Sequence, residues 1–171
     1  LIDIVKNDEI KNYHSKIFYD FYLSTIEKKW GGVYLNQKFW DLLIQYLKNR
    51  IVFIFSKQDG EFIGGAINLI DQSTIYGRNW GSTKDIKFMH FEVCYYQAIE
   101  YAIMNNLKKV EAGAQGFHKI QRGYLPTKTY SIHNFSNNNL SLAVQKFLNS
   151  ERTQIGKELD LLMTKSPYKL I

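Results

Sequence analysis

The chain has 171 residues, which suits one domain that buries most of its apolar surface. Hydrophobic residues make up 45% and charged residues 22%, a balance that excludes a disordered chain. The net charge of +6 favours an anionic partner, namely nucleic acid, a phosphorylated cofactor or an anionic membrane face, but no run of five basic residues marks a nucleic-acid-binding arm.

Cysteine content and the start of the chain limit the protein class. Cys94 is the single cysteine, so an internal disulfide or a cysteine-rich zinc site is excluded, and we expect its thiol to be buried and inert. No apolar run reaches the roughly 18 residues of a membrane span, which predicts a chain without a transmembrane segment. Because the chain starts at Leu1 without Met and without a signal-peptide pattern, we expect it to be a piece of a longer, cytoplasmic protein.

Two amphipathic helices are predicted in the first third of the chain. The first spans about residues 12–29, and Trp30-Gly31-Gly32 ends it. The second spans residues 37–48 with Asn36 as its N-cap. Apolar residues recur at helical spacing in both segments: Ile17, Phe18, Phe21, Tyr22 and Ile26, then Phe39, Trp40, Leu43, Ile44 and Leu47.

The next segment predicts a three-stranded antiparallel meander. A buried strand over residues 51–55 is followed by Asp59-Gly60, a strong hairpin signal. The return strand, residues 62–70, contains Gly64-Gly65-Ala66, which indicates a bulge or a close approach to a ligand. A third strand is expected over residues 74–80.

The remaining pattern alternates helix and strand. A helix is predicted over residues 88–105, with an apolar face formed by Phe91, Tyr95, Ala98, Ile99, Ala102 and Ile103. A short strand at 109–112 follows this crossover helix and should run parallel to the strand before it. A strand over 127–135 and a helix over 140–164 complete a mixed α/β domain spanning residues 1–171.

The stretch from Glu111 to Tyr124 has the composition of neither a helix nor a strand. It contains three glycines, which permit left-handed backbone or close approach to a ligand. Lys119 and Arg122 lie three residues apart, so one helical turn would place both cations on one face. One interpretation is a glycine-rich surface connection, and the other is a strand-to-loop transition that holds an anionic group of a substrate.

Candidate site residues follow from where strands end and helices begin. In a mixed sheet, ligands bind at the carboxyl ends of strands, which selects Tyr76, Arg78 and Trp80 and the segment after Ala112. His90 and Glu92 lie in the first turn of the next helix, where backbone N–H groups attract negative charge. Their spacing of two residues points them to different sides, and either could be a general base. His118 is a further candidate base.

Other site classes lack their sequence signals. The four histidines are dispersed, so we expect no metal site. No nucleophile elbow, phosphate-binding loop or dinucleotide-binding turn occurs. Aromatic residues follow helical core periodicity, which disfavours base stacking on a strand.

Four segments resemble one bacterial family. They are KKWGGVYLNQKFWDLL at 28–43, YGRNWG at 76–81, HFEVCYYQAIEYAI at 90–103 and EAGAQGFHKIQRGYLP at 111–126. They resemble the FemAB-like branch of the GNAT acyltransferase superfamily, whose members are labelled peptidoglycan biosynthesis or recognition proteins. The resemblance implies a GNAT-like (acyl-CoA N-acyltransferase) fold with an antiparallel meander flanked by helices, and identifies this chain with the C-terminal of two such halves.

The resemblance also implies an activity, because related enzymes attach aminoacyl groups to cell-wall precursors. The acyl donor would be aminoacyl-tRNA or acyl-CoA, although residues 78–84 do not match the pyrophosphate-binding turn of simple GNAT enzymes. An amine would attack a carboxyl group held near Arg78, Gln115 and Lys119, with Arg122 beside them. Glu92, His90 or His118 would take the proton, and backbone N–H groups near Gly113 or Gly116 would stabilise the oxyanion.

Two alternatives to catalysis by this chain remain open. It could be a non-catalytic half that binds a cell-wall precursor or a partner chain, or it could bind tRNA or another RNA with strong salt dependence. Aromatic side chains, if exposed, could form a homodimer face.

Overall fold

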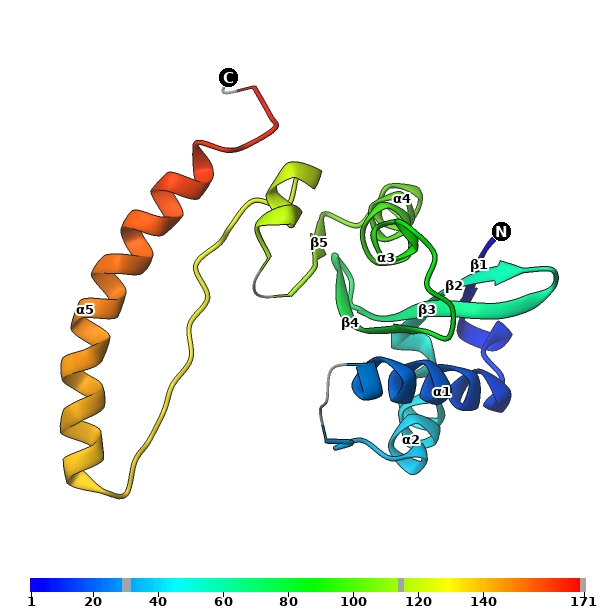
Figure 1. The fold of residues 1–171 in the computed structure, drawn as a ribbon, viewed down its shortest axis with the longest axis horizontal. Coiled ribbons are helices and arrows are strands. Elements are labelled where there is room, and N and C mark those ends of the chain that lie inside the picture. Colours follow the sequence, from blue (N-terminus) through cyan, green and yellow to red (C-terminus); the bar gives the residue numbers. More distant parts are fainter. Residues whose placement is uncertain (29–31, 114–115, 170–171) are drawn as a thin grey trace. The chain divides into compact units, whose positions relative to one another are not determined.

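The structure is a computed structural model that describes residues 1–28, 32–113 and 116–169, and the chain divides into two units, Leu1–Ala114 and Gln115–Ile171. The first unit holds the sheet and the second ends in a long helix (Figure 1). Within the described ranges, no helix is both long enough and apolar enough to cross a membrane. That residues 1–171 form one domain of a longer protein stays a prediction.

The first two helices form where the apolar spacing predicts them. Helix α1 spans Asn12–Lys28 and α2 spans Gln37–Leu47. Asn36 is the N-cap of α2, and its Oδ1 accepts a hydrogen bond from the Phe39 N–H at 3.1 Å. The predicted stop signal at Trp30 and Gly31 lies outside the described residues.

Five strands form one sheet in which the order along the chain is the order in space, β1-β2-β3-β4-β5. They span Ile2–Lys6, Ile51–Gln58, Glu61–Ile70, Thr74–Ser82 and Lys109–Glu111. The first four pair antiparallel, and β5 pairs parallel to β4, as a crossover helix requires. The meander and the parallel strand are confirmed. Strand β1 was not predicted.

Two features of the β2–β3 hairpin explain its sequence. Asp59 and Gly60 both have positive φ, 52° and 84°, which is the requirement of a tight two-residue turn. At Gly65 a Cβ would lie 2.5 Å from Cδ1 of Phe55, so the sheet itself requires glycine there. The predicted close approach is therefore to a side chain of the same sheet.

The helix after β4 is interrupted by a wider turn. Helix α3 (Met89–Phe91), the π-helical segment η3 (Glu92–Tyr96) and α4 (Gln97–Met104) follow one another directly. The prediction of a helix over 88–105 is confirmed. The prediction that Ile103 packs in its apolar face is wrong, since this side chain is 71% exposed. A π turn inserts an extra residue, which rotates the later side chains relative to an uninterrupted α-helix.

Apolar side chains fill both faces of the sheet. On one face, Phe53, Phe55 and Ile67 pack with α1 and α2 around Phe18 and Trp40. On the other face, the strands pack against the helix formed by α3, η3 and α4 through these residues: Val52, Ile54, Ala66, Ile75, Val93, Ala98 and Ala102. Alternate residues of each strand thus face different helices, and the sheet is the middle of three layers (Figure 1).

The second unit contains the 3₁₀ helix η4 (Phe117–Arg122) and helix α5 (Asn138–Met163). The long helix is confirmed and begins at the N-cap Asn137, whose side chain accepts from Leu140 N. The predicted strand over 127–135 is wrong, because the segment has no regular secondary structure. Tyr130 and Ile132 are 89% and 100% exposed, so its alternating apolar residues have no buried face to fill.

Candidate active site

A cavity of about 140 Å³ lies within the first unit, between the sheet and the helix that follows β4. We call it the sheet pocket. Its walls come from β3, from the middle of β4, from α3 and η3, and from the residue after β5: Ala66, Asn68, Gly77, Arg78, Asn79, Trp80, His90, Cys94, Tyr95 and Ala112. Residues far apart in sequence thus line one cavity.

The pocket forms where the pairing of β4 becomes irregular. Towards β5, pairing ends at Tyr76 and Glu111, and the next residues, Gly77 and Ala112, both line the pocket. Towards β3, Ile67 pairs with Asn79 while Asn68 pairs with Gly77, so Arg78 is an extra residue with no Cα partner on β3. This bulge places Arg78 in the pocket wall, and its side chain is exposed to solvent.

Aromatic rings from β4, α3 and η3 form one side of the sheet pocket. The half-buried His90 of α3 packs against Trp80 of β4, with ring centroids 4.7 Å apart. The ring of Tyr95 meets His90 edge-on at 5.3 Å. The structure therefore brings together three of the predicted site residues, Arg78, Trp80 and His90.

Glu92 faces a different cavity from His90. It lines a second cavity of about 350 Å³ with Ser56, Phe88 and Tyr96. Its Oε1 accepts a hydrogen bond from Gln97 Nε2 at 2.8 Å. The two-residue spacing predicted that His90 and Glu92 point to different sides, and the structure agrees.

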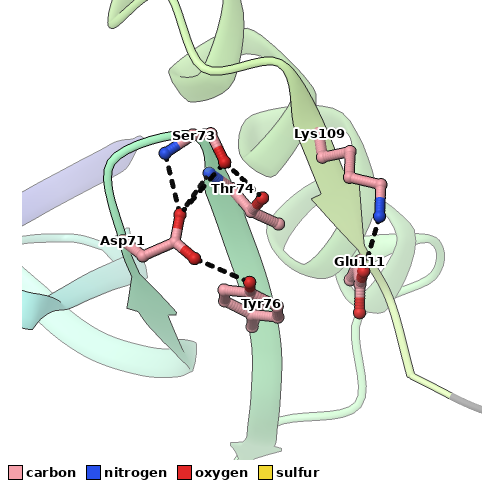
Figure 2. Close-up of polar contacts among 6 residues, drawn as sticks. All are labelled: Asp71, Ser73, Thr74, Tyr76, Lys109 and Glu111. Atoms are coloured by element: carbon pink, nitrogen blue, oxygen red, sulfur yellow. Dashed lines mark hydrogen bonds and ion pairs between the residues drawn. The ribbon is translucent and has the colours of Figure 1, made fainter.

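Tyr76 lies on β4, and its side chain is hydrogen-bonded to the turn between β3 and β4, as Figure 2 shows. Its hydroxyl donates to Asp71 Oδ2 at 2.7 Å, and Asp71 Oδ1 accepts from the backbone N–H groups of Ser73 and Thr74, each at 2.8 Å. These bonds, first that from Ser73 and then that from Tyr76, lower the pKa of Asp71, and the bond to Asp71 raises the pKa of Tyr76. Tyr76 does not line the sheet pocket.

The glycine-rich stretch leaves β5 and ends in the second unit. Gly113, Gly116 and Gly123 have positive φ of 74°, 107° and 90°, as their frequency in the sequence suggested. Lys119 and Arg122 both belong to the 3₁₀ helix η4, whose three-residue repeat places them on one face.

The remaining candidates of this stretch are His118 and Gln115. His118 is exposed, and its carbonyl oxygen accepts a hydrogen bond from Arg122 Nη1 at 2.6 Å. Gln115 lies outside the described residues.

Asn68, Cys94 and Tyr95 are among the residues of the sheet pocket that were missed from the sequence, together with Gly77 and Asn79. Cys94 is half-buried rather than fully buried. The available signal for Asn68 was its place as an amide within the apolar strand pattern of residues 62–70. For Cys94 and Tyr95, the π segment that sets their direction has no sequence signature that we recognise.

Comparison with known proteins identifies the fold. A family model described as FemAB-like, peptidoglycan biosynthesis/recognition, matches residues 1–170. No curated protein sequence matches the chain.

Three solved structures illustrate the likeness. A predicted acetyltransferase from Clostridium acetobutylicum, solved with acetyl-CoA, matches at a TM-score of 0.59 and 13% identity, over 78% of this chain and 96% of that one. A possible acetyltransferase from Clostridium difficile matches at 0.57 and 8%, over 80% and 98%. A soil-metagenome aminoglycoside acetyltransferase matches at 0.53 and 9%, also over 80% and 98%. The fold is that of the GNAT acetyltransferases, as predicted.

Proposed function

The chain belongs to the FemAB-like family of peptidoglycan biosynthesis/recognition proteins, and we propose that it is an N-acyltransferase domain acting on an amine of a cell-wall precursor. The observation that carries this proposal is the sheet pocket, in which a histidine, two aromatic rings and a bulged arginine line one small cavity. An acyltransferase-like domain is what the family and the fold support. The roles of individual residues are our proposal.

In the proposed reaction, the neutral amine of the acceptor attacks the carbonyl carbon of an activated acyl group. A C–N bond forms, and the imidazole of His90 takes the proton from nitrogen. The tetrahedral intermediate then collapses, the bond to the leaving oxygen or sulfur breaks, and that atom takes up a proton. A histidine in this role contributes about 10²–10⁴-fold to the rate.

Charged groups would hold the acyl donor. Arg78 is exposed at the bulge and suits a carboxylate or phosphate. In the second unit, the cations Lys119 and Arg122 on η4, with Gln115 and His118 beside them in sequence, are themselves suited to an anionic group of a substrate. Tyr76 would contact the substrate with its ring at the end of the β4–β5 pairing. Glu92 would act as a general base from its own cavity, which is not the cavity that His90 lines.

The donor class follows from the segment between β4 and α3. In the acetyltransferase from Clostridium acetobutylicum, acetyl-CoA is bound. Here the segment Thr83–Lys87 contains no glycine, and the Thr83 N–H donates to Ile63 O at 3.1 Å. A glycine-rich turn with free N–H groups is what a pyrophosphate prefers. We therefore favour aminoacyl-tRNA as donor, with acyl-CoA as the alternative.

A label-transfer assay tests the proposal. The intact protein is incubated with radiolabelled aminoacyl-tRNA or acyl-CoA and a muramyl-peptide precursor, and labelled product is counted for wild type, His90→Gln and His133→Gln. Because His133 is exposed and lies outside the sheet pocket, its variant is the matched control. We expect His90→Gln to lose about 10²-fold or more and the control to keep full activity. Equal activity in all three proteins would refute the role of His90.

A non-catalytic binding half is the second candidate. The observation in its favour is the small volume of the sheet pocket, about 140 Å³, against the roughly 300–1,000 Å³ of common ligand sites. In that case the precursor would bind to the protein without any transfer of label, whichever donor is supplied.

A further inference from the structure

Asn68 is a buried amide with one unused polar atom. It lies on β3, is 0% exposed, and faces the helix layer together with Ala66 of the same strand. Its Nδ2 donates to the carbonyl oxygen of Val52 at 3.4 Å. In the part of the chain that the structure describes, its Oδ1 has no hydrogen-bond partner. A buried oxygen that loses water without gaining a donor destabilises the fold, so its retention calls for a reason.

Asn68 is one of the residues that line the sheet pocket. Gly77 is its partner across the β3–β4 ladder, and a Cβ on Gly77 would lie 3.8 Å from Asn68 Oδ1. A side chain at position 77 would not clash, since the closest contact of its Cβ would be an ordinary 3.4 Å to Glu111 O. Because residue 77 is glycine, no side chain on this neighbouring strand position packs against the buried amide oxygen.

The walls define which group fits. The oxygen of Asn68 requires a donor, and the rings of Trp80 and Tyr95 favour an apolar substituent. Among the lining residues none is acidic and Arg78 is cationic, so a protonated ammonium group would lack a counter-charge. A neutral amine on a short carbon chain satisfies all three conditions, whereas a plain acetyl group carries no hydrogen-bond donor.

We propose that Asn68 is a specificity-determining residue, whose Oδ1 accepts a hydrogen bond from the neutral primary amine of the acceptor in the sheet pocket. This inference rests on the proposed transfer to an amine. When one N–H of this amine is bound to Asn68, the nitrogen lone pair stays free to attack the acyl carbon. The other N–H can then donate to His90. With no side chain at Gly77 beside it, the oxygen selects amines over groups of the same shape that cannot donate a hydrogen bond.

The test is a binding measurement without turnover. Glycine methyl ester carries an amine that is largely neutral above about pH 8, and its N,N-dimethyl analogue has the same shape near the ester but no N–H. Both are titrated into the ¹⁵N-labelled protein, and the Trp80 indole and Asn68 amide signals report binding. We expect the ester with the free amine to bind about tenfold more tightly, the value of one hydrogen bond.

Three variants assign the effect to Asn68. Asn68→Leu should abolish the preference while leaving the melting temperature equal or higher, because an unpaired buried oxygen is removed. Gly77→Ala, which fits without a clash, should weaken binding of the amine, because its methyl group would lie 3.8 Å from Asn68 Oδ1 and narrow the approach to it. Thr74→Val removes another buried polar group of the sheet outside the pocket and should preserve the preference.

The outcomes separate this inference from the proposed reaction. A preference that survives in both Asn68→Leu and Gly77→Ala would overturn the role of Asn68. An Asn68-dependent response to pantetheine, an amide-bearing piece of an acyl carrier, with none to the amine would also overturn it, since the pocket would then hold the donor. Asn68-dependent amine binding in a protein that transfers no label supports the inference and counts against the reaction alone.

Discussion

The imidazole of His90 lies 4.7 Å from the indole of Trp80, centroid to centroid, with the two rings inclined at 52°. One ring comes from the first turn after β4 and the other from β4 itself, so the sheet fixes one wall against which the histidine packs. Trp80 is thus a positioning residue for His90 in the proposed site.

This contact predicts a graded effect of substitutions at Trp80. Trp80→Phe keeps a ring beside His90, and Trp80→Ala removes the wall. We expect the kcat of transfer to fall little in the first variant and about tenfold or more in the second, with the KM for the acyl donor nearly unchanged, because orientation is lost rather than binding. An equal fall in both variants, or a change confined to KM, would contradict a positioning role.

A second prediction concerns stability near neutral pH. His14 is 2% exposed and its Nδ1 accepts a hydrogen bond from the Lys11 N–H at 2.9 Å. Burial lowers the pKa of His14 from its ordinary value of 6.5, with Asp3 opposing the shift and Lys57 adding to it. The unfolded chain therefore binds the proton more tightly, so stability is complete above pH 6.5 and declines as the pH falls below it.

Urea unfolding at pH values on both sides of 6.5 measures this effect. His14→Gln keeps an acceptor for Lys11 and cannot titrate, so its stability should be flat across this window. Asp8, Asp41 and Asp71 have pKa values lowered from 3.8, and their contribution is lost only at still lower pH. A wild-type midpoint that stays constant across pH 6.5 would contradict the prediction.

A third prediction contrasts two glycines. At Gly81 a Cβ would overlap the carbonyl oxygen of Phe21 in α1, whereas at Gly156 in α5 it would meet nothing within 4 Å. Gly81→Ala should therefore lower the free energy of unfolding by about 1–3 kcal/mol, because the backbone must move. Gly156→Ala should raise the helix content seen by circular dichroism, since alanine favours a helix by about 1 kcal/mol. If both substitutions changed the free energy of unfolding in the same direction, packing at Gly81 would not be decisive.

A fourth prediction concerns the start of α2. Asn36→Ala removes the acceptor of the Phe39 N–H and should lower the free energy of unfolding by about 1 kcal/mol. Asn36→Asp, which retains the acceptor, should restore stability. If alanine and aspartate at this position gave the same denaturation midpoint, the cap would contribute nothing.

Local signals in the sequence were sufficient for several elements. Asn36 marked the start of α2, Asp59-Gly60 marked the turn after β2, and Asn105-Asn106 marked the end of α4, where Asn106 adopts a φ of 55°. Each depends on the backbone preferences of one or two residues. The parallel direction of β5 followed from the intervening helix.

The remaining features depend on partners distant in the sequence. The segment 127–135 alternates like a strand, but it pairs with no strand within the described residues, and Tyr130 and Ile132 stay exposed to water. Ile103 follows helical spacing, yet the π turn before it changes the direction of its side chain. The unused oxygen of Asn68 becomes visible only once β4, with Gly77 opposite, is in place.

Because each strand of the sheet lies beside the one that precedes it in the chain, every pairing can form as soon as its later member leaves the ribosome. Two long excursions separate paired strands among the described residues: α1 and α2 between β1 and β2, and the helix between β4 and β5, which closes on a strand of only three residues. All five strands and both helix layers that cover them lie before Ala112 in the sequence, so these elements can begin to pair during translation before the second unit has been made.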